Sequence, residues 1–173
     1  MFTLVTGGSG SGKSEYAESL VDSWNDPKIY IATMMPFDEE TRKKIQRHRE
    51  MRRDKGFITL ECFTGLSDLC LPEECHVLLD CMSNLTANEM FTEEGAGADT
   101  RTSILSGIEH LLASAEDVCI VTNEIFSDGI EYGAETILYQ KCLGDLNCRM
   151  AEMADRVVEV CLLYTSDAAD EED

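Results

Sequence analysis

A glycine-rich segment near the amino terminus carries the clearest chemical signal in the sequence. Residues 7–14 read Gly-Gly-Ser-Gly-Ser-Gly-Lys-Ser and fit the pattern G-x-x-x-x-G-K-[S/T] without a mismatch. Glycines let successive backbone N–H groups point at phosphate oxygens, and the positive end of a following helix adds to the attraction. A turn that merely joins a strand to a helix would leave the lysine and the last serine unexplained. We therefore predict that a nucleoside triphosphate is bound by Gly7, Gly8, Ser9, Gly10, Ser11, Gly12, Lys13 and Ser14.

Within this segment, two side chains have specific expected roles. Lys13 supplies a mobile ammonium group for the β and γ phosphates, and Ser14 ligates Mg²⁺. A second metal ligand is Asp80, which ends the apolar run His-Val-Leu-Leu-Asp at residues 76–80. If that run is a buried strand, the carboxylate lies at the sheet edge where ligands bind in open α/β sheets. An Asp that caps a turn at residues 81–84 explains Asp80 alone equally well, but the glycine-rich segment favours the metal site.

A histidine in a strongly basic stretch is the next candidate. Eight of the 14 Lys and Arg residues lie between Arg42 and Lys55, against only two carboxylates in the same stretch. We expect a helix that starts at Asp38 and carries its cations towards its end, as the helix dipole favours. Neighbouring cations should lower the pKa of His48 and leave a neutral ring nitrogen that can attack phosphorus. The alternative is a solvated charged helix whose histidine packs partly on the core.

The elements that must position these residues alternate between strand-like and helix-like patterns. Short runs rich in Val, Ile and Leu are the expected strands, and longer segments between them are the expected helices. This alternation predicts one three-layer α/β domain, residues 1–163, with a mostly parallel central sheet covered on both faces. The expected strands are 2–6, 28–32, 57–61, 76–80, 118–122 and 157–162; the expected helices are 13–23, 38–54, 100–115 and 134–154, with a polar loop at 92–100.

Length and charge limit the possible functions. The 173 residues are 43% hydrophobic, which suits one globular domain with a buried core. The formal net charge of -20 argues against an exposed nucleic-acid-binding surface and against binding to anionic membranes. No apolar run approaches the roughly 20 residues of a membrane span. We therefore expect a cytoplasmic protein that binds no nucleic acid and does not insert stably into a membrane.

Cysteine usage agrees with a reducing compartment. The eight cysteines show no paired Cys-x-x-Cys spacing, and the sequence starts directly with an apolar strand pattern, so we expect neither a structural zinc site nor a signal peptide. We expect the cysteines to be reduced and to act as small buried hydrophobic residues. Residues 164–173 are different, because they are acidic and lack periodicity. We expect a disordered tail there, and its sequence resembles translated adapter sequence more than a natural terminus.

In the order of its motifs, the chain resembles the bifunctional adenosylcobinamide kinase/adenosylcobinamide-phosphate guanylyltransferase family of cobalamin biosynthesis. A phosphate-binding loop joined to a histidine in a basic helix and a late Asn123-Glu124 pair is more specific than the loop alone. The resemblance covers nearly the whole chain, residues 2–163. It is carried by residues 6–8, 11–15, 30–33, 45–49, 52, 78–81, 84–85, 122–125, 129–130, 144, 147 and 154–155.

This resemblance implies a fold of the P-loop NTPase type, a homotrimer and two reactions. The first is phosphorylation of the aminopropanol hydroxyl of adenosylcobinamide by ATP or GTP. The second is transfer of GMP from GTP to adenosylcobinamide phosphate, with release of pyrophosphate. His48 matches the histidine that the family guanylylates, Lys13 joins it as a catalytic residue, and Mg²⁺ is held by Ser14 and Asp80. Further nucleotide contacts are implied for Ala32, Thr33, Met34, Arg49, Glu50, Met51, Arg52, Glu61 and Asp80.

The sequence also departs from the family pattern. Gly10 stands where the family commonly has Arg, residues 126–132 replace a Gly-Ile-Val-Pro ending, and residues 139–141 replace a Phe-Arg-Asp stretch. The family's basic carboxyl terminus is replaced by the acidic tail. Two other functions stay open at this point: a different P-loop small-molecule kinase in which His48 acts only through its charge, and a GTP-binding regulatory module without turnover.

Overall fold

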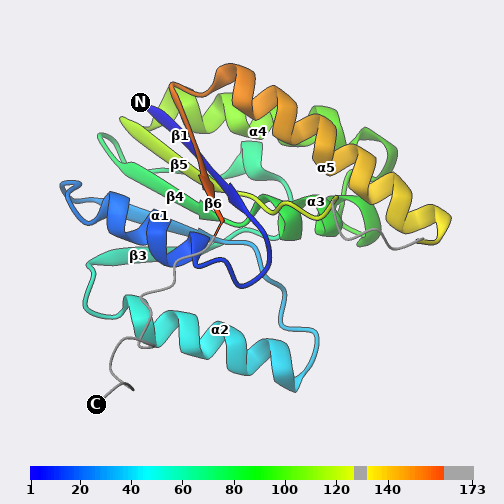
Figure 1. Ribbon diagram of the computed structural model, residues 1–173. Coiled ribbons are helices and arrows are strands. Elements are labelled where there is room, and N and C mark those ends of the chain that lie inside the picture. Colours follow the sequence, from blue (N-terminus) through cyan, green and yellow to red (C-terminus); the bar gives the residue numbers. More distant parts are fainter. Residues whose placement is uncertain (127–131, 162–173) are drawn as a thin grey trace, which may run out of the picture.

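The computed structural model describes residues 1–126 and 132–161, so the tail at 164–173 and the unusual segment 127–131 lie outside the described residues. The described residues form a central sheet with helices on both faces (Figure 1). The strands are β1 (Phe2–Gly7), β2 (Lys28–Ala32), β3 (Phe57–Glu61), β4 (His76–Asp80), β5 (Asp117–Val121) and β6 (Arg156–Val160). The helices are α1 (Lys13–Val21), α2 (Glu39–Arg52), α3 (Met82–Phe91), α4 (Thr100–Ser114) and α5 (Ala134–Met153), with 3-10 turns at Leu66–Asp68 and Gly97–Asp99.

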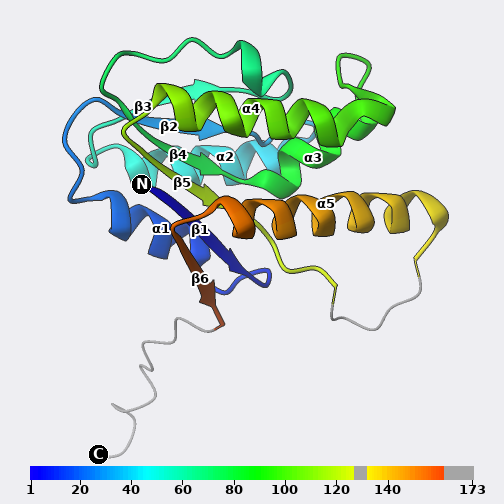
Figure 2. The same cartoon turned by 90° about the horizontal axis from the view of Figure 1, so that it is seen from above.

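The strands pair in the order β3-β2-β4-β5-β1-β6, and each of these pairings is parallel. The prediction of a parallel three-layer α/β fold is therefore confirmed. Helix α1 packs on β1, β4 and β5, whereas α4 and α5 cover the other face, as Figure 2 shows from above. Because all strands run the same way, the loops that follow β1, β2, β4 and β5 meet at one edge of the sheet.

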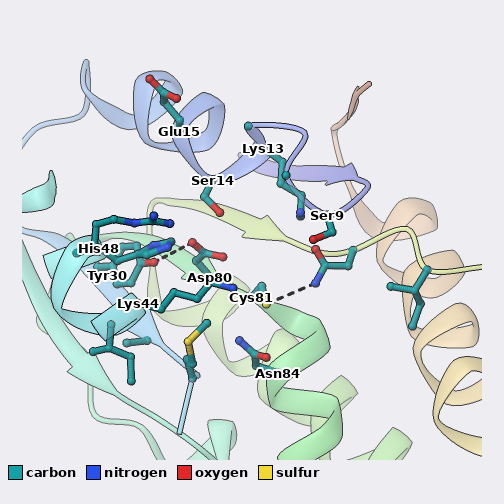
Figure 3. A pocket seen from close by; sticks show the side chains of 18 of the residues that line it. Ser9, Lys13, Ser14, Glu15, Tyr30, Lys44, His48, Asp80, Cys81 and Asn84 are labelled. Carbon is teal, nitrogen blue, oxygen red and sulfur yellow. Dashed lines mark hydrogen bonds between the residues drawn. The ribbon is translucent and has the colours of Figure 1, made fainter. Parts of the chain in front are cut away.

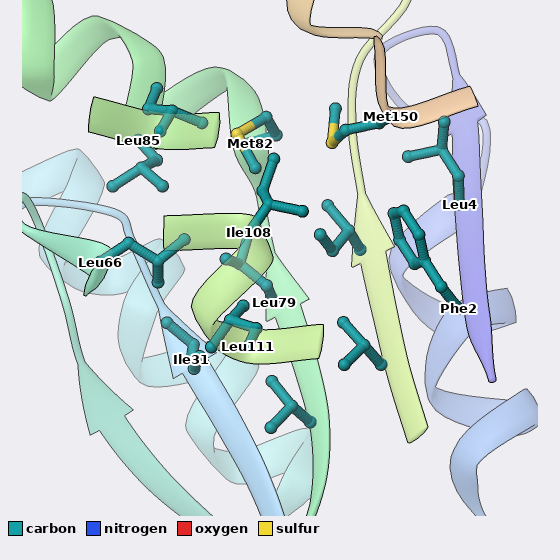
Figure 4. Packing of buried hydrophobic residues seen from close by; sticks show 14 of the residues in the cluster. Phe2, Leu4, Ile31, Leu66, Leu79, Met82, Leu85, Ile108, Leu111 and Met150 are labelled. Carbon is teal, nitrogen blue, oxygen red and sulfur yellow. The ribbon is translucent and has the colours of Figure 1, made fainter. Parts of the chain in front are cut away.

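Side chains of each central strand alternate between two cores, because both faces of the sheet are covered. In β4, Val77 and Leu79 belong to the core under α3, α4 and α5, and Leu78 belongs to the core under α1. Figure 4 shows the larger core, in which Leu79 lies near Ile108 of α4. The same alternation places Tyr30 of β2 on the α1 side. Elements predicted from apolar patterns agree with the structure to within two residues at each end.

Helix α3 was not predicted, since the sequence analysis expected at most a turn after Asp80. The reason is that α3 buries polar side chains as well as apolar ones, so no apolar periodicity is visible. Asn88 donates to the backbone oxygen of Thr33 at 2.8 Å, and the Glu89 carboxylate accepts from the backbone N–H of Gly65 at 2.8 Å. These bonds allow the polar residues to be buried.

Helix α2 stands apart from the rest of the molecule (Figure 1). It starts as predicted, with the Asp38 side chain accepting from the Thr41 N–H at 2.7 Å. Only Arg52, at its last turn, is buried. Just beyond, Lys55 forms an ion pair of 2.5 Å with Glu18, a side chain of α1 that is 4% exposed. The helix is thus attached at its carboxyl end.

The cysteines are free, as predicted, but the expectation that they are buried is only partly correct. Four are buried and one is half-buried, whereas Cys70, Cys148 and Cys161 are exposed. Among the described residues, no group of three or more His, Cys, Asp or Glu side chains could hold a metal ion. No helix in this part of the chain is long and apolar enough to cross a membrane.

Candidate nucleotide-binding site

The loops at the carboxyl edge of the sheet enclose a cavity of about 1140 Å³ (Figure 3). One wall is the glycine-rich loop, a second is the inner face of α2, and the third is formed by α3, the residues after β5 and the first turns of α5. Asp80 lies at the floor, at the end of β4. A cavity of this size lies slightly above the upper end of the range usual for small-molecule sites.

The glycine-rich loop is shaped by its glycines. Gly12 caps α1 with a φ of 83°, a left-handed conformation that side chains disfavour. A Cβ on Gly7 would lie 2.4 Å from the backbone oxygen of Val160 in β6. Lys13, 8% exposed, folds back over the loop and donates from Nζ to the backbone oxygen of Gly8 at 2.9 Å. Burial lowers the pKa of the Lys13 amine below its ordinary value.

Asp80 and Ser14 face one another across the floor of the cavity (Figure 3). The Tyr30 hydroxyl donates to Oδ2 of Asp80 at 2.8 Å. Burial, and next the nearby Asp80 carboxylate, raise the pKa of Tyr30 well above its usual value. The tyrosine is therefore the donor in this bond. A carboxylate and a hydroxyl oxygen side by side are the type of ligands that Mg²⁺ prefers.

The guanidinium group of Arg52 stacks on the ring of Tyr30, 3.5 Å from the ring centroid. Arg52 is 5% exposed, and its Nε and Nη1 atoms are buried without a hydrogen-bond partner among the described residues. Buried donors that lack an acceptor are costly, and more so when they are charged. Because Arg52 lines the cavity, the positive charge of its guanidinium attracts an anionic ligand there.

His48 lies one turn before Arg52 on the same face of α2 and lines the same cavity. Its pKa is lowered, as predicted. Burial is the largest cause, however, whereas the prediction relied on cations. Arg52 and other cations of α2 act in the same direction, and the Asp80 carboxylate opposes them. The imidazole is therefore neutral near pH 7.

The cavity brings together most of the residues singled out in the sequence, including His48 and Asp80. Five do not line it: Gly7, Gly8, Ser11, Thr33 and Glu50. Thr33 is fully buried. Its hydroxyl donates to the backbone oxygen of Cys81 and accepts from the backbone N–H of Cys81, so it is satisfied away from the cavity. Glu50 is exposed and accepts from Gln46 at 2.9 Å, since a residue two positions from His48 points away from the histidine's face.

The third wall of the cavity was missed as a binding surface. It includes Asn84, Asn123, Glu124, Ile125, Tyr132, Thr136, Tyr139 and Gln140. Asn123 donates to the Ser83 hydroxyl, and the Tyr139 hydroxyl donates to the backbone oxygen of Ser83 at 3.1 Å. Residues 123–125 lie just beyond the end of β5 at Val121, so the rule that strand ends converge could have placed them. Nothing local in the sequence indicated that the start of α5 reaches the site.

A glycine-rich phosphate loop between β1 and α1, with a carboxylate at the end of β4, the strand on the far side of β5 in the same parallel sheet, defines a P-loop nucleotide-binding α/β protein. The sequence model described as cobinamide kinase / cobinamide phosphate guanyltransferase matches residues 3–162. The chain therefore belongs to the cobinamide kinase/cobinamide phosphate guanyltransferase family. It is an enzyme of adenosylcobalamin biosynthesis. This family membership favours the bifunctional transferase over the two alternatives left open by the sequence, a different P-loop small-molecule kinase and a GTP-binding regulatory module.

Individual relatives agree with this family. The bifunctional adenosylcobalamin biosynthesis protein CobU of Salmonella typhimurium (strain LT2) is 31% identical over 172 residues, covering 91% of this chain and 93% of that protein. CobU of Escherichia coli (strain K12) is 30% identical, with 91% of this chain and 93% of that protein covered. Among solved structures, the flagellar accessory protein FlaH from Methanocaldococcus jannaschii is similar with a TM-score of 0.45 and 12% identity, covering 91% of this chain and 70% of that one.

Proposed function

We propose that the kinase and guanylyltransferase reactions both use this one cavity, and that His48 is the residue that accepts GMP. The observation that carries the proposal is that a partly buried histidine with a lowered pKa lines the same space as Lys13 and Ser14 of the phosphate loop. A triphosphate held by the loop has its phosphorus atoms within the space that His48 lines. The neutral imidazole is the form that can act as nucleophile.

The cavity residues fit a bound Mg²⁺. Ser14 supplies a hydroxyl oxygen and Asp80 a carboxylate oxygen, and the two side chains face one another across the floor of the cavity. Mg²⁺ is usually held by one or two carboxylates together with water and substrate phosphates, so a protein cluster of three acidic ligands is not needed. When bound, the ion neutralises charge on the phosphates of the nucleotide. ATP and GTP are the proposed nucleotides.

The remaining nucleotide contacts come from the α2 side of the cavity. Arg52 lines this side and brings the positive charge of its guanidinium to the nucleotide phosphates. Arg49 forms an ion pair with Glu61 of β3, and both side chains line the cavity. Ala32, Met34 and Met51 line the same side and complete the proposed nucleotide-binding surface.

Guanylyl transfer is then two displacements at one phosphorus atom. A ring nitrogen of His48 attacks the α-phosphorus of GTP; a P–N bond forms, the bond to the bridging oxygen breaks, and pyrophosphate leaves. A phosphate oxygen of adenosylcobinamide phosphate next attacks the same phosphorus, the P–N bond breaks, and His48 is restored. In the kinase step the acceptor hydroxyl oxygen attacks the γ-phosphorus directly; the bond from this phosphorus to the β–γ bridging oxygen breaks, the nucleoside diphosphate leaves, and the hydroxyl proton is released to solvent. Lys13 stabilises charge on the phosphates in both reactions.

Intact-protein mass spectrometry under neutral conditions tests this assignment. After incubation with GTP and Mg²⁺, the chain should gain one guanylyl group, and the His48→Asn variant should gain none while still binding GTP. His110→Asn is the matched control, because Nε2 of His110 bonds to the backbone oxygen of Leu69 and lies outside the cavity lining. A guanylyl adduct on the His48→Asn variant would overturn the role of His48. Retention of adenosylcobinamide phosphorylation by this variant would separate the two activities.

The family resemblance also implies a homotrimer that works in the cytoplasm on adenosylcobinamide and its phosphate. Light scattering of the purified chain tests the oligomeric state. A mass of three chains supports the trimer, and a monomer at micromolar concentration contradicts it.

A further inference from the structure

Tyr30 connects two parts of the site that lie far apart in the sequence. Its side chain is buried, at 3% exposure, and belongs to the core on the α1 side of the sheet. Its hydroxyl donates to Oδ2 of Asp80 at 2.8 Å (Figure 3). Its ring carries the guanidinium of Arg52, 3.5 Å from the ring centroid. It therefore touches both the candidate metal carboxylate and the helix that bears His48.

The sheet register explains why a tyrosine can reach Asp80. β2 and β4 are parallel neighbours, with Tyr30 opposite Leu78 and Ala32 opposite Asp80. Tyr30 and Asp80 are thus diagonal neighbours on one face of the sheet, a separation that only long side chains bridge. A phenylalanine at this position would fill the same space and carry the same guanidinium, but it would leave the carboxylate without this donor.

We propose that Tyr30 is a positioning residue for the metal site: its hydroxyl fixes the Asp80 carboxylate through Oδ2, so that Oδ1 is presented to the Mg²⁺ of the bound nucleotide. This inference rests on the proposed role of Asp80 as an Mg²⁺ ligand. Hydrogen bonds from neighbouring groups to metal-ligating side chains fix the orientation of the ligand, and their loss typically costs about 10–100-fold in metal affinity or activity.

The test measures how much Mg²⁺ strengthens GTP binding, by calorimetry with and without the ion. In Tyr30→Phe we expect GTP affinity without metal to be unchanged and the gain from Mg²⁺ to fall about tenfold. The Mg²⁺ concentration that gives half-maximal activity should rise correspondingly, while kcat at saturating Mg²⁺ is largely kept. This rescue by excess ion is not expected of a residue that only supports the fold.

Tyr16→Phe is the matched control. Tyr16 lies on α1, outside the cavity lining, and its hydroxyl accepts from Arg156 at 3.5 Å. Loss of the Tyr16 hydroxyl should leave both the metal-free affinity for GTP and the gain in that affinity from Mg²⁺ unchanged. Thermal unfolding of both variants shows whether the fold is kept.

Asp80→Asn separates this inference from the proposed function. If Asp80→Asn keeps the full gain from Mg²⁺, Asp80 is not a metal ligand and the proposed metal site fails. If Asp80→Asn loses the gain but Tyr30→Phe keeps it, only the positioning role of Tyr30 is overturned. If Tyr30→Phe loses metal-free GTP binding as well, Tyr30 supports the fold or the nucleotide pocket in general, and the positioning role is again overturned.

Discussion

Replacement of Arg52 by methionine should affect stability and nucleotide binding in opposite directions. The guanidinium is buried on the Tyr30 ring, with Nε and Nη1 lacking partners among the described residues. Methionine can keep much of the apolar contact with the ring and removes the buried charge. Replacing buried charged groups by well-packed apolar ones is often neutral or stabilising. The same change removes the guanidinium that we assign to the nucleotide phosphates.

The structure allows the size of both effects to be worked out. Each buried donor without an acceptor costs about 1–3 kcal/mol. The cation–π contact with Tyr30 stabilises the folded state by about 0.5–2 kcal/mol. Two such donors at the middle of the range cost about 4 kcal/mol, and the buried cation–π contact offsets about 2 kcal/mol of this, so we expect Arg52→Met to raise the free energy of unfolding by about 2 kcal/mol. For a domain of this length the melting temperature shifts by about 2–4 °C per kcal/mol, which gives a rise of about 4–8 °C.

The expected effect on binding follows from the lost hydrogen bonds. Hydrogen bonds that involve a charged group contribute about 1.5–3 kcal/mol, so GTP affinity should fall roughly 10–150-fold. Arg53→Met is the control, since Arg53 is the exposed neighbour of Arg52, lies outside the cavity lining and carries the same charge. Calorimetric melting without nucleotide and GTP titration measure the two effects. A lower melting temperature for Arg52→Met with unchanged GTP affinity would refute the reasoning and make Arg52 a structural anchor of α2.

Three further predictions follow from the same structure. Burial lowers the pKa of His48 below the ordinary value of 6.5, so the neutral imidazole that we propose as nucleophile persists as the pH falls. The rate of guanylylation, measured by quench flow over a pH series, should therefore have its acid midpoint below 6.5. A midpoint above this value contradicts the argument. Lys55→Ala should lower the free energy of unfolding by about 2–3 kcal/mol in urea, because it leaves the buried Glu18 carboxylate unpaired. Glu18→Ala should lower it less, since the Lys55 ammonium can reach water. Equal losses of stability in the two variants would speak against this asymmetry. Gly7→Ala should lower the free energy of unfolding by about 1–3 kcal/mol, because its Cβ would collide with the β6 backbone. Gly8→Ala is the control: a Cβ there meets nothing within 4 Å, so the melting temperature should not change.

Features that depend on local sequence were predictable. Apolar runs in the strands reflect burial on both faces of a parallel sheet, and the phosphate loop follows from glycines at fixed positions before Lys13. The start of α2 at Asp38 follows from the preference for a side chain that can cap the first turn. In each case the physical cause lies within a few residues of the position that carries the signal.

Features that depend on distant contacts were not predictable. Strand order decides that β4 lies beside β2, and only this pairing brings Tyr30 to Asp80. Helix α3 escaped prediction because its buried polar residues are stabilised by partners elsewhere in the chain, such as Thr33. Thr33 itself was assigned to the nucleotide by resemblance, yet its hydroxyl is bonded to the backbone at Cys81. Position in a motif therefore did not determine where this side chain points.

The attachment of α2 links its stability to the chemistry of the site. Arg52 is the one buried residue of this helix, and it is held by a tyrosine that also bonds the candidate metal carboxylate. His48 lies one turn earlier on the same face, so the contact that fixes Arg52 also fixes the direction in which His48 points. We expect a nucleotide that pairs with the Arg52 guanidinium to stabilise this docked arrangement, because a ligand that binds one state shifts the population towards it. Under the proposed function, nucleotide binding therefore holds His48 against the phosphate that it attacks.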